Sequence, residues 1–264
     1  MSAEFDFSSL DESDRSDVFE YALRLGDDHL VLGHRISEWC GHGPILEEDI
    51  ALANIALDLI GAGTNFLRLA AQAENAGRDE DRLAYFRNEY EFKNLMLVEQ
   101  PNGDFGKTMA RQFLFDAHIV PLLDRLGKSA CKPLADVSMK TLKEAKYHLR
   151  HSSEWVIRLG DGTAESKERV QRAVDELWTF TGELFVMDEL ETRLAAKGIV
   201  PSRSEIQPIW QQTVSSVFSR ATLEVPTDEQ YMHSGSRSGR HSEHLGPMLA
   251  EMQIVARSYP DARW

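Results

Sequence analysis

The chain has 264 residues, 42% of them hydrophobic, and its 43 acidic and 29 basic residues give a formal net charge of -14. This length suffices for one large core or two smaller ones. The negative charge argues against a nucleic-acid backbone as the partner, because that binding depends on clustered lysine and arginine. Two cysteines, Cys40 and Cys131, are too few for a disulfide framework or a zinc site. We expect an acidic cytoplasmic protein.

Residues 1–16 are rich in acidic and small residues and lack the basic and apolar regions of a secretory signal. We expect a flexible N-terminal extension there, followed by a single helical domain over residues 17–264. The first helix is predicted over Val18–Trp39, where the glycine-rich sequence CGHGP stops it.

Residues 49–73 are long and apolar enough to resemble a membrane span. Polar and charged side chains along the segment make a span unfavourable, so we expect no membrane association. Apolar residues recur at helical spacing in two stripes, one from Leu46 to Ala71 and one from Leu52 to Leu69. A helix that is apolar on two faces is typical of the centre of a soluble bundle. The polar and charged side chains that make a membrane span of residues 49–73 unfavourable are Asn54, Asp58, Asn65 and Arg68.

The rest of the chain is predicted to be helical by the same periodicity, with the turn sequences PNGD, GDGT and KGIVPSRS between helices. Val, Ile and Thr nowhere alternate with polar residues over the length of a strand. The pattern predicts an all-α fold, a helical bundle with additional C-terminal helices. The further helices are expected at Glu80–Glu99, Phe105–Leu126, Leu134–Leu159, Ala164–Lys197, Arg203–Ala221 and His241–Ser258.

Carboxylates in these apolar helices are the main candidates for chemistry, because phosphate-binding loops and nucleophile motifs are absent from the sequence. In ferritin-like oxygenases a metal pair is held by a Glu from each of two helices and a Glu-x-x-His motif from each of two others. Asp28 lies thirty residues before Asp58, and Asp116 lies twenty-eight before Glu144. Two antiparallel helix pairs would bring the members of each pair to a similar depth.

The Glu-x-x-His pattern is broken in one of the two places where we test it and ambiguous in the other, where a Tyr could ligate iron and His148 and His151 share the helix face of Glu144. The residues three after Asp58 and Glu144 are Gly61, which cannot bind a metal, and Tyr147. His148 lies four after Glu144, on the same helix face, and is not excluded by geometry. We therefore predict a degenerate site in which hydrogen bonds and ion pairs replace the metal. Its candidate residues are Asp28, Asp58, Asp116, Glu144, Tyr147 and His148.

Several long runs carry a resemblance, among them RLGDDHLVLGHRISEWCGHGPILEEDIALANIALDLIGAGTNFL, LVEQPNGDFGKTMARQFLFDAH and LKEAKYHLRHSSEWVIRLGDGT. From about Tyr21 to Trp264 the chain resembles the non-catalytic ferritin-like subunits of the bacterial ring-1,2-phenylacetyl-CoA epoxidases. The resemblance implies a ferritin-like fold with a degenerate metal site, no catalytic residue and no cofactor of its own. It also implies a structural role beside a catalytic A subunit that carries the di-iron centre.

The same resemblance implies the remaining partners. Such complexes also contain a small B subunit, and a flavin and iron-sulfur reductase docks transiently. Together they convert phenylacetyl-CoA to its ring epoxide with O2 and NADPH during aerobic phenylacetate breakdown.

Two alternatives to the structural role remain open from the sequence. One is a self-sufficient di-metal carboxylate oxygenase that uses the acidic residues above together with His148. The other is a helical module that binds acyl-CoA or another anion. Its candidate residues are Arg237 and Arg240, which lie in the stretch HSGSRSGRHSEH before a helix start.

Overall fold

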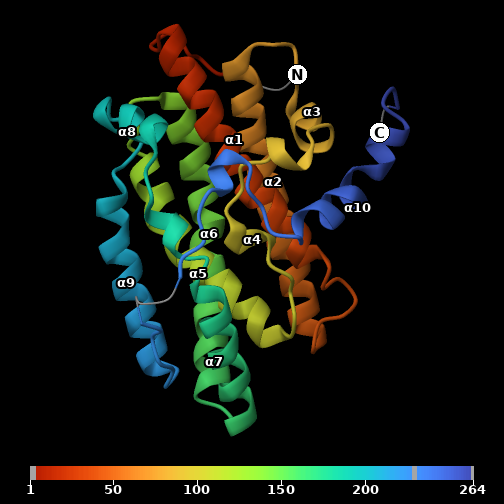
Figure 1. The fold of residues 1–264 in the computed structure, drawn as a ribbon, viewed down its shortest axis with the longest axis vertical. Helices are drawn as coiled ribbons and strands as arrows, with labels where there is room; N and C mark the ends of the chain where they lie inside the picture. Colours follow the sequence, from red (N-terminus) through yellow and green to blue (C-terminus); the bar gives the residue numbers. More distant parts are fainter. Residues whose placement is uncertain (1–3, 228–230, 263–264) are drawn as a thin grey trace. The chain divides into compact units, whose positions relative to one another are not determined.

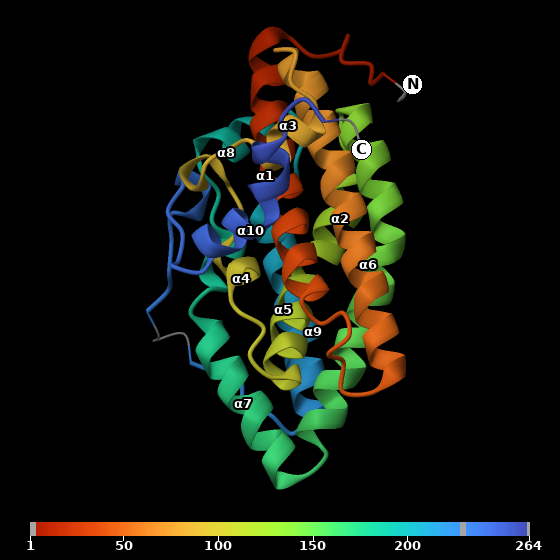
Figure 2. The same ribbon diagram turned by 90° about the vertical axis from the view of Figure 1, so that its right-hand side faces the viewer.

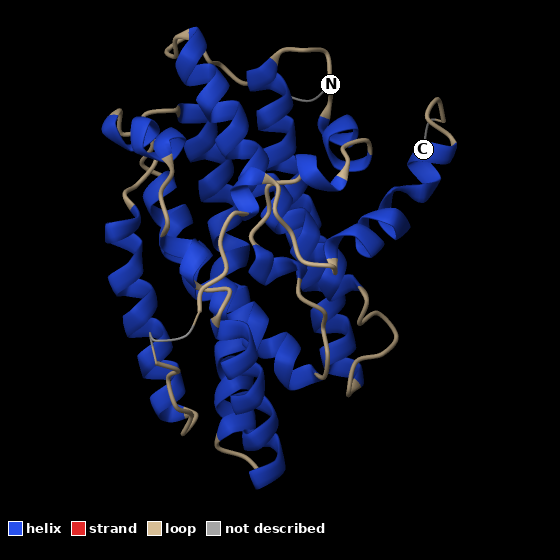
Figure 3. Cartoon of the chain, in the orientation of Figure 1, coloured by secondary structure: helices blue, strands red, loops and turns tan. Residues whose placement is uncertain are grey.

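The computed structural model describes residues 4–227 and 231–262. These residues form helices and loops, and no strand occurs among them (Figure 3). They belong to two compact units. The first unit comprises Met1–Gln100 together with Gly235–Trp264, and the second comprises Pro101–Ser234. We describe each unit separately.

The first unit is built on an antiparallel pair of long helices, α1 and α2 (Figure 1). Glycines let their backbones approach closely. A Cβ atom at Gly63 would lie 3.0 Å from the backbone nitrogen of Leu30, and one at Gly33 would lie 3.1 Å from that of Ile60. Larger side chains at these glycines would force the pair apart. The helices of this unit are α1 (Glu12–Ser37), α2 (Leu46–Glu74), α3 (Glu80–Tyr85), η1 (Glu89–Glu91), α4 (Met96–Glu99), η3 (Ser236–Ser238) and α10 (Leu245–Ser258).

Helix α1 begins six residues earlier than predicted, and the residues before it are held in place. Asp11 caps the helix by accepting a hydrogen bond from the Asp14 amide at 2.8 Å. Phe7 is buried. Arg15 donates to the carbonyls of Gln72 and Ala73, which lie in the last turn of α2 and lack partners within that helix. From Phe5 on, the described residues contact α2 and include the start of α1, and the flexibility of the extension over residues 1–16 stays a prediction.

The single helix expected at Glu80–Glu99 is instead three short helices joined by extended backbone. The backbone amides of Lys93 and Leu95 donate to the carboxylates of Asp27 and Asp28, at 2.8 and 2.7 Å. Because side chains of α1 take these N–H groups, the segment does not continue as a helix.

One apolar stripe of α2 is not buried. Leu46, Ile50 and Leu57 are 72%, 55% and 67% exposed, so the expectation that both apolar faces lie inside a core is wrong for this part of the helix. Among the described residues one helix, α2, is long and apolar enough to cross a membrane, judged by length and composition alone. These three side chains form an exposed apolar stripe on the first unit.

The second unit is organised around α5, which contacts α6, α7 and α9 (Figure 2). Aromatic side chains fill its interior: the rings of Trp178 and Trp210 lie 5.4 Å apart, and the Trp210 indole donates to the Leu114 carbonyl at 3.1 Å. The predicted bounds of α5 agree with the structure. The helices are α5 (Phe105–Leu126), α6 (Lys132–Gly160), α7 (Ala164–Trp178), η2 (Gly182–Phe185), α8 (Glu189–Ala196) and α9 (Arg203–Arg220).

The helix expected at Ala164–Lys197 is also broken, because α7 ends at Trp178. Thr179 then bonds a distant part of the chain: its carbonyl accepts from the His233 amide at 2.9 Å, and its hydroxyl donates to the Tyr231 carbonyl. Asp188 starts α8 as its cap, accepting from the Glu191 amide at 2.9 Å. Pairing with residues 231–233 thus replaces the helix that periodicity predicts.

Candidate functional site

The predicted degenerate site divides between the two units. Asp28 and Asp58 belong to the first unit, whereas Asp116, Glu144, Tyr147 and His148 belong to the second. Each half is considered within its own unit.

In the first unit, Asp28 and Asp58 do not lie at the same depth. Because Gly63 lies against Leu30 and Gly33 against Ile60, the level of Asp28 on α1 corresponds to about residue 65 of α2. Asp58 is therefore about two helical turns away along the axis, or roughly 10 Å. The thirty-residue spacing does not produce the pair that we expected.

Asp28 is bound by groups of the protein itself. Its side chain is 1% exposed, and its two oxygens accept hydrogen bonds from Arg237 at 3.0 and 2.8 Å. The Leu95 amide donates to the same carboxylate at 2.7 Å. A paired guanidinium supplies the positive charge that a buried carboxylate requires.

Glu99 is a second buried carboxylate of this unit, and the sequence did not point to it. His241 Nδ1 and the Asn94 side-chain amide each lie 3.0 Å from its Oε2, and the Ser242 amide donates to Oε1 at 2.6 Å. The other ring nitrogen of His241 lies 3.0 Å from the Phe92 carbonyl. Since both ring nitrogens face acceptors, the arrangement favours the doubly protonated imidazolium.

The pKa of His241 follows from this environment. Burial by itself lowers the pKa, but hydrogen bonding to Glu99, the charge of Glu99 and the Phe92 carbonyl outweigh it and raise the pKa above its ordinary value. The ion pair thereby keeps the segment over residues 235–244 bound to α4.

Asp27 is the third buried carboxylate and was also missed. Arg87 binds both of its oxygens, one of them at 2.9 Å, and the Arg87 guanidinium lies 4.2 Å from the centroid of the Phe92 ring. The sequence feature that could have indicated Asp27 is the pair of adjacent acids, DD in RLGDDH, within an apolar helix. Their partners lie 60 and 209 residues away in the chain, beyond the range of local patterns.

In the second unit, Asp116 is buried without a cation bonded to it. Gln112 and Ser152 donate to its oxygens, each at 2.8 Å. Burial raises the pKa of Asp116 to about 8, although both hydrogen bonds act to lower it. The geometry also suits a neutral acid, because a protonated Asp116 can donate to the Ser152 hydroxyl while that hydroxyl donates to the Leu149 carbonyl at 3.4 Å.

Glu144 lies about two helical turns from the level of Asp116, which instead faces Ser152 on α6. His148 is 3% exposed, Glu144 is half-buried, and Tyr147 is 47% exposed. The Tyr147 ring stacks on His151, with centroids 6.4 Å apart. The tyrosine that replaces histidine in the failed motif thus lies at the surface.

Within each unit, the predicted residues do not fit a metal site. The Asp28 carboxylate is occupied by Arg237, and the Asp116 carboxyl by Gln112 and Ser152. Over residues 4–227 and 231–262, no group of three or more His, Cys, Asp or Glu side chains is placed to hold a metal ion.

The residues predicted to contact an anion differ in their surroundings. Arg237 is mostly buried and pairs with Asp28, so its guanidinium is already engaged with a carboxylate. Arg240 is exposed. Binding of acyl-CoA by these arginines stays a prediction.

Comparison with known proteins identifies the family. A family described as "Phenylacetic acid catabolic protein" matches residues 4–264. The chain is also 50% identical over 244 residues to the C subunit of the 1,2-phenylacetyl-CoA epoxidase of Escherichia coli (strain K12). That alignment covers 92% of this chain and 98% of the relative. The chain belongs to the phenylacetic acid catabolic protein family.

This membership confirms the resemblance carried by the long sequence runs, and the all-α, ferritin-like fold class is confirmed with it. Two features of this phenylacetic acid catabolic protein are notable. Three buried carboxylates of the first unit, Asp27, Asp28 and Glu99, are each bound to a basic side chain, and Asp116 in the second unit is bound by two neutral donors. These features generate three predictions.

Replacing Arg237 with Met should destabilise the protein by about 3 kcal/mol, because it leaves the Asp28 carboxylate buried without its cation. The double variant Asp28→Asn, Arg237→Met should recover part of the loss. Urea unfolding measures both. As a control, Lys132→Met, which breaks the exposed pair with Asp136, should have little effect. Equal losses in Arg237→Met and the control would refute the structural role of the pair.

Replacing Asp116 with Asn should remove a pH dependence of stability. The folded protein keeps the Asp116 proton up to about pH 8, whereas the unfolded chain loses it near the ordinary pKa of about 3.9. The wild type should therefore lose stability from pH 5 to 8, by about 1 kcal/mol per pH unit. Urea titrations at several pH values should show a flatter profile for Asp116→Asn, but not for the exposed control Asp136→Asn. Parallel wild-type and Asp116→Asn profiles would count against a neutral Asp116.

His241→Gln tests the Glu99 pair. Because the folded-state pKa of His241 is raised, its contribution should be complete below the unfolded-state value of about 6.5 and lost as pH rises through the folded-state pKa. The difference in unfolding free energy between wild type and variant should therefore shrink from pH 6 to pH 9. The exposed His42→Gln is measured alongside it as a control. A difference for His241→Gln that stays constant over this pH range would contradict the charged pair.

Proposed function

We propose that this chain is a structural, non-catalytic subunit of a multicomponent di-iron monooxygenase that epoxidises the ring of phenylacetyl-CoA in the cytoplasm. In this assembly it pairs with a catalytic A subunit and supports it. The complex also includes a small B subunit and a flavin and iron-sulfur reductase using NADPH, so the metal and redox groups belong to other chains.

The observation that carries this proposal is the pairing of Asp28 with Arg237. A carboxylate that serves as a metal ligand needs its oxygens available, and here both oxygens accept from a guanidinium and one also accepts from a backbone amide. Asp116 is likewise held by two neutral donors. Both interactions stabilise the helices without a metal, as a supporting role requires.

Two further observations support a partner. The 50% identical relative is named as one subunit of an epoxidase, and the alignment covers nearly all of that protein. The exposed stripe of Leu46, Ile50 and Leu57 on α2 is an apolar surface of the kind that protein interfaces cover. A partner that binds only the folded chain would also stabilise it by mass action.

The proposal is tested by measuring the metal content and the association of the chain. Expressed alone in iron-replete medium and desalted, it should contain no stoichiometric iron by plasma mass spectrometry. Co-expressed with the catalytic A subunit of the same organism, it should copurify as a complex of defined mass, and that complex should contain iron. Leu57→Glu on the exposed stripe should weaken copurification, whereas Lys132→Glu on α6 serves as an exposed control.

A chain that alone binds about two irons, lost on Glu144→Ala, would instead favour a self-sufficient di-metal enzyme. An iron-free chain that never associates with the A subunit would also overturn the proposal.

A further inference from the structure

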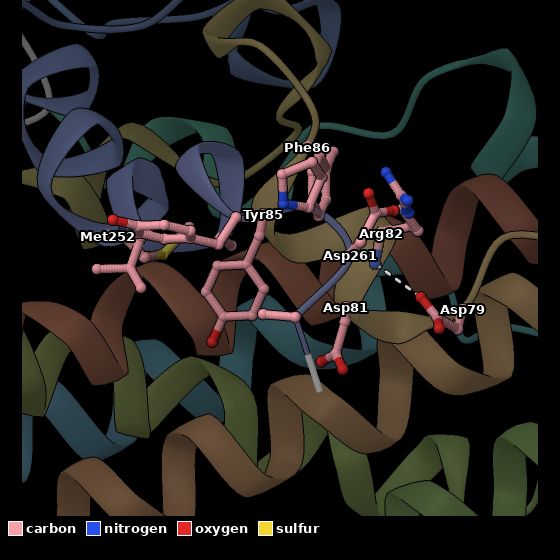
Figure 4. Close-up of a pocket in the computed structure, with 12 residues that line it drawn as sticks. Asp79, Asp81, Arg82, Tyr85, Phe86, Met252 and Asp261 are labelled. Carbon is pink, nitrogen blue, oxygen red and sulfur yellow. Dashed lines mark hydrogen bonds between the residues drawn. The ribbon is translucent and has the colours of Figure 1, made fainter. Parts of the chain in front are cut away.

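A pocket of about 630 Å³ lies between α3 and the end of α10, within the first unit (Figure 4). Its volume is in the range of sites that hold a ligand or a large side chain. None of its lining residues belongs to the predicted metal site or to the carboxylate pairs above. They come from Asp79–Phe86 and Met252–Ala262.

The walls of this pocket combine apolar and acidic groups. Tyr85, Phe86 and Met252 supply aromatic and apolar surface (Figure 4). Three carboxylates also line it, against the single guanidinium of Arg82, so negative charge is in excess. The three are Asp79, Asp81 and Asp261.

The one arginine does not neutralise these acids. Its guanidinium lies over the Phe86 ring, 4.2 Å from the centroid. Burial and the neighbouring charges of Asp79 and Glu80 raise the pKa of Asp81, although Arg68 opposes them. Burial and Asp81 also raise the pKa of Tyr85. Burial is the larger cause of each shift, and the neighbouring acids add to it. The excess of negative charge follows from the three carboxylates and one guanidinium of the lining, and a cation entering the pocket would offset it.

Apolar surface continues beyond the pocket along α10. Val255 and Tyr259 line the pocket yet are 52% and 65% exposed, and the neighbouring Ile254 is 61% exposed. A small cation inside the pocket would leave this strip uncovered. A protein segment would cover the strip and fill the pocket together.

We infer that this pocket docks a segment of a partner protein that presents an arginine or lysine between apolar side chains. The basic group enters among Asp79, Asp81 and Asp261, where the aromatic rings can also contact it. The apolar neighbours of that residue cover Val255 and Tyr259. This inference rests on the proposed function, since it assigns a second contact surface to the same kind of assembly.

The test uses the full chain and the purified partner subunits of the proposed epoxidase. The variant Asp81→Lys reverses a charge of the pocket, and Val255→Glu places a charge on the apolar strip. Because both positions are exposed, both variants should fold. Circular dichroism and the midpoints of unfolding check this. Isothermal titration should show at least about tenfold weaker binding for each, the size of a moderate interface hot spot. The control Asp136→Lys makes the same charge change at an exposed position of α6. Hydrogen exchange of residues 79–86 and 252–259 should slow in the complex.

The outcomes separate this inference from the proposed function. If wild type binds the partner subunits and both variants bind equally well, the pocket is not a docking site but the supporting role stands. If wild type does not bind them at all, both proposals fail. If the variants change self-association in light scattering without changing partner binding, the occupant is a second copy and the inference is wrong.

Discussion

The need of buried carboxylates for positive partners governs the architecture of the first unit. Asp27 and Asp28 are adjacent and almost fully buried on α1, and a buried charge without a partner would cost several kcal/mol. Arg87 and Arg237 meet this need from two different parts of the chain. The extended run through Lys93 and the placement of residues 235–244 follow from these pairs.

The second unit handles a buried acid in a different way. Asp116 receives two neutral hydrogen bonds, and burial shifts its equilibrium toward the protonated form. In the first unit Asp27, Asp28 and Glu99 are each paired with a basic side chain, and in the second unit Glu191 is paired with Arg203 in the same way. Asp116 differs from these acids because its two donors are neutral. In both arrangements the oxygens of the buried acid accept hydrogen bonds from groups of the chain itself.

Sequence periodicity predicted the helices that bury a regular apolar face, such as α5, α6 and α9, nearly to the residue. It failed at Glu80–Glu99 and Ala164–Lys197, where the chain's backbone groups bond residues far away in the sequence. Local patterns contain no information about such partners.

The candidate site shows the same limit. Asp28 and Asp116 were recognised as interior acids because they interrupt apolar helices. The depth of Asp58 and Glu144 depended on helix register, which glycine contacts such as Gly63 against Leu30 determine. Spacing along the chain could not supply that register, nor could it identify Arg237 as the partner of Asp28.

The division of the first unit along the chain also affects the order in which the protein can form. The second unit, residues 101–234, is continuous in the sequence, so its internal contacts can form before residues 235–244 are made. The first hundred residues emerge before it, yet Asp28 and Glu99 must wait for Arg237 and His241. Until residues 235–244 are made, Asp28 has the Leu95 amide and Glu99 the Asn94 side chain as partners, but neither acid has its basic partner.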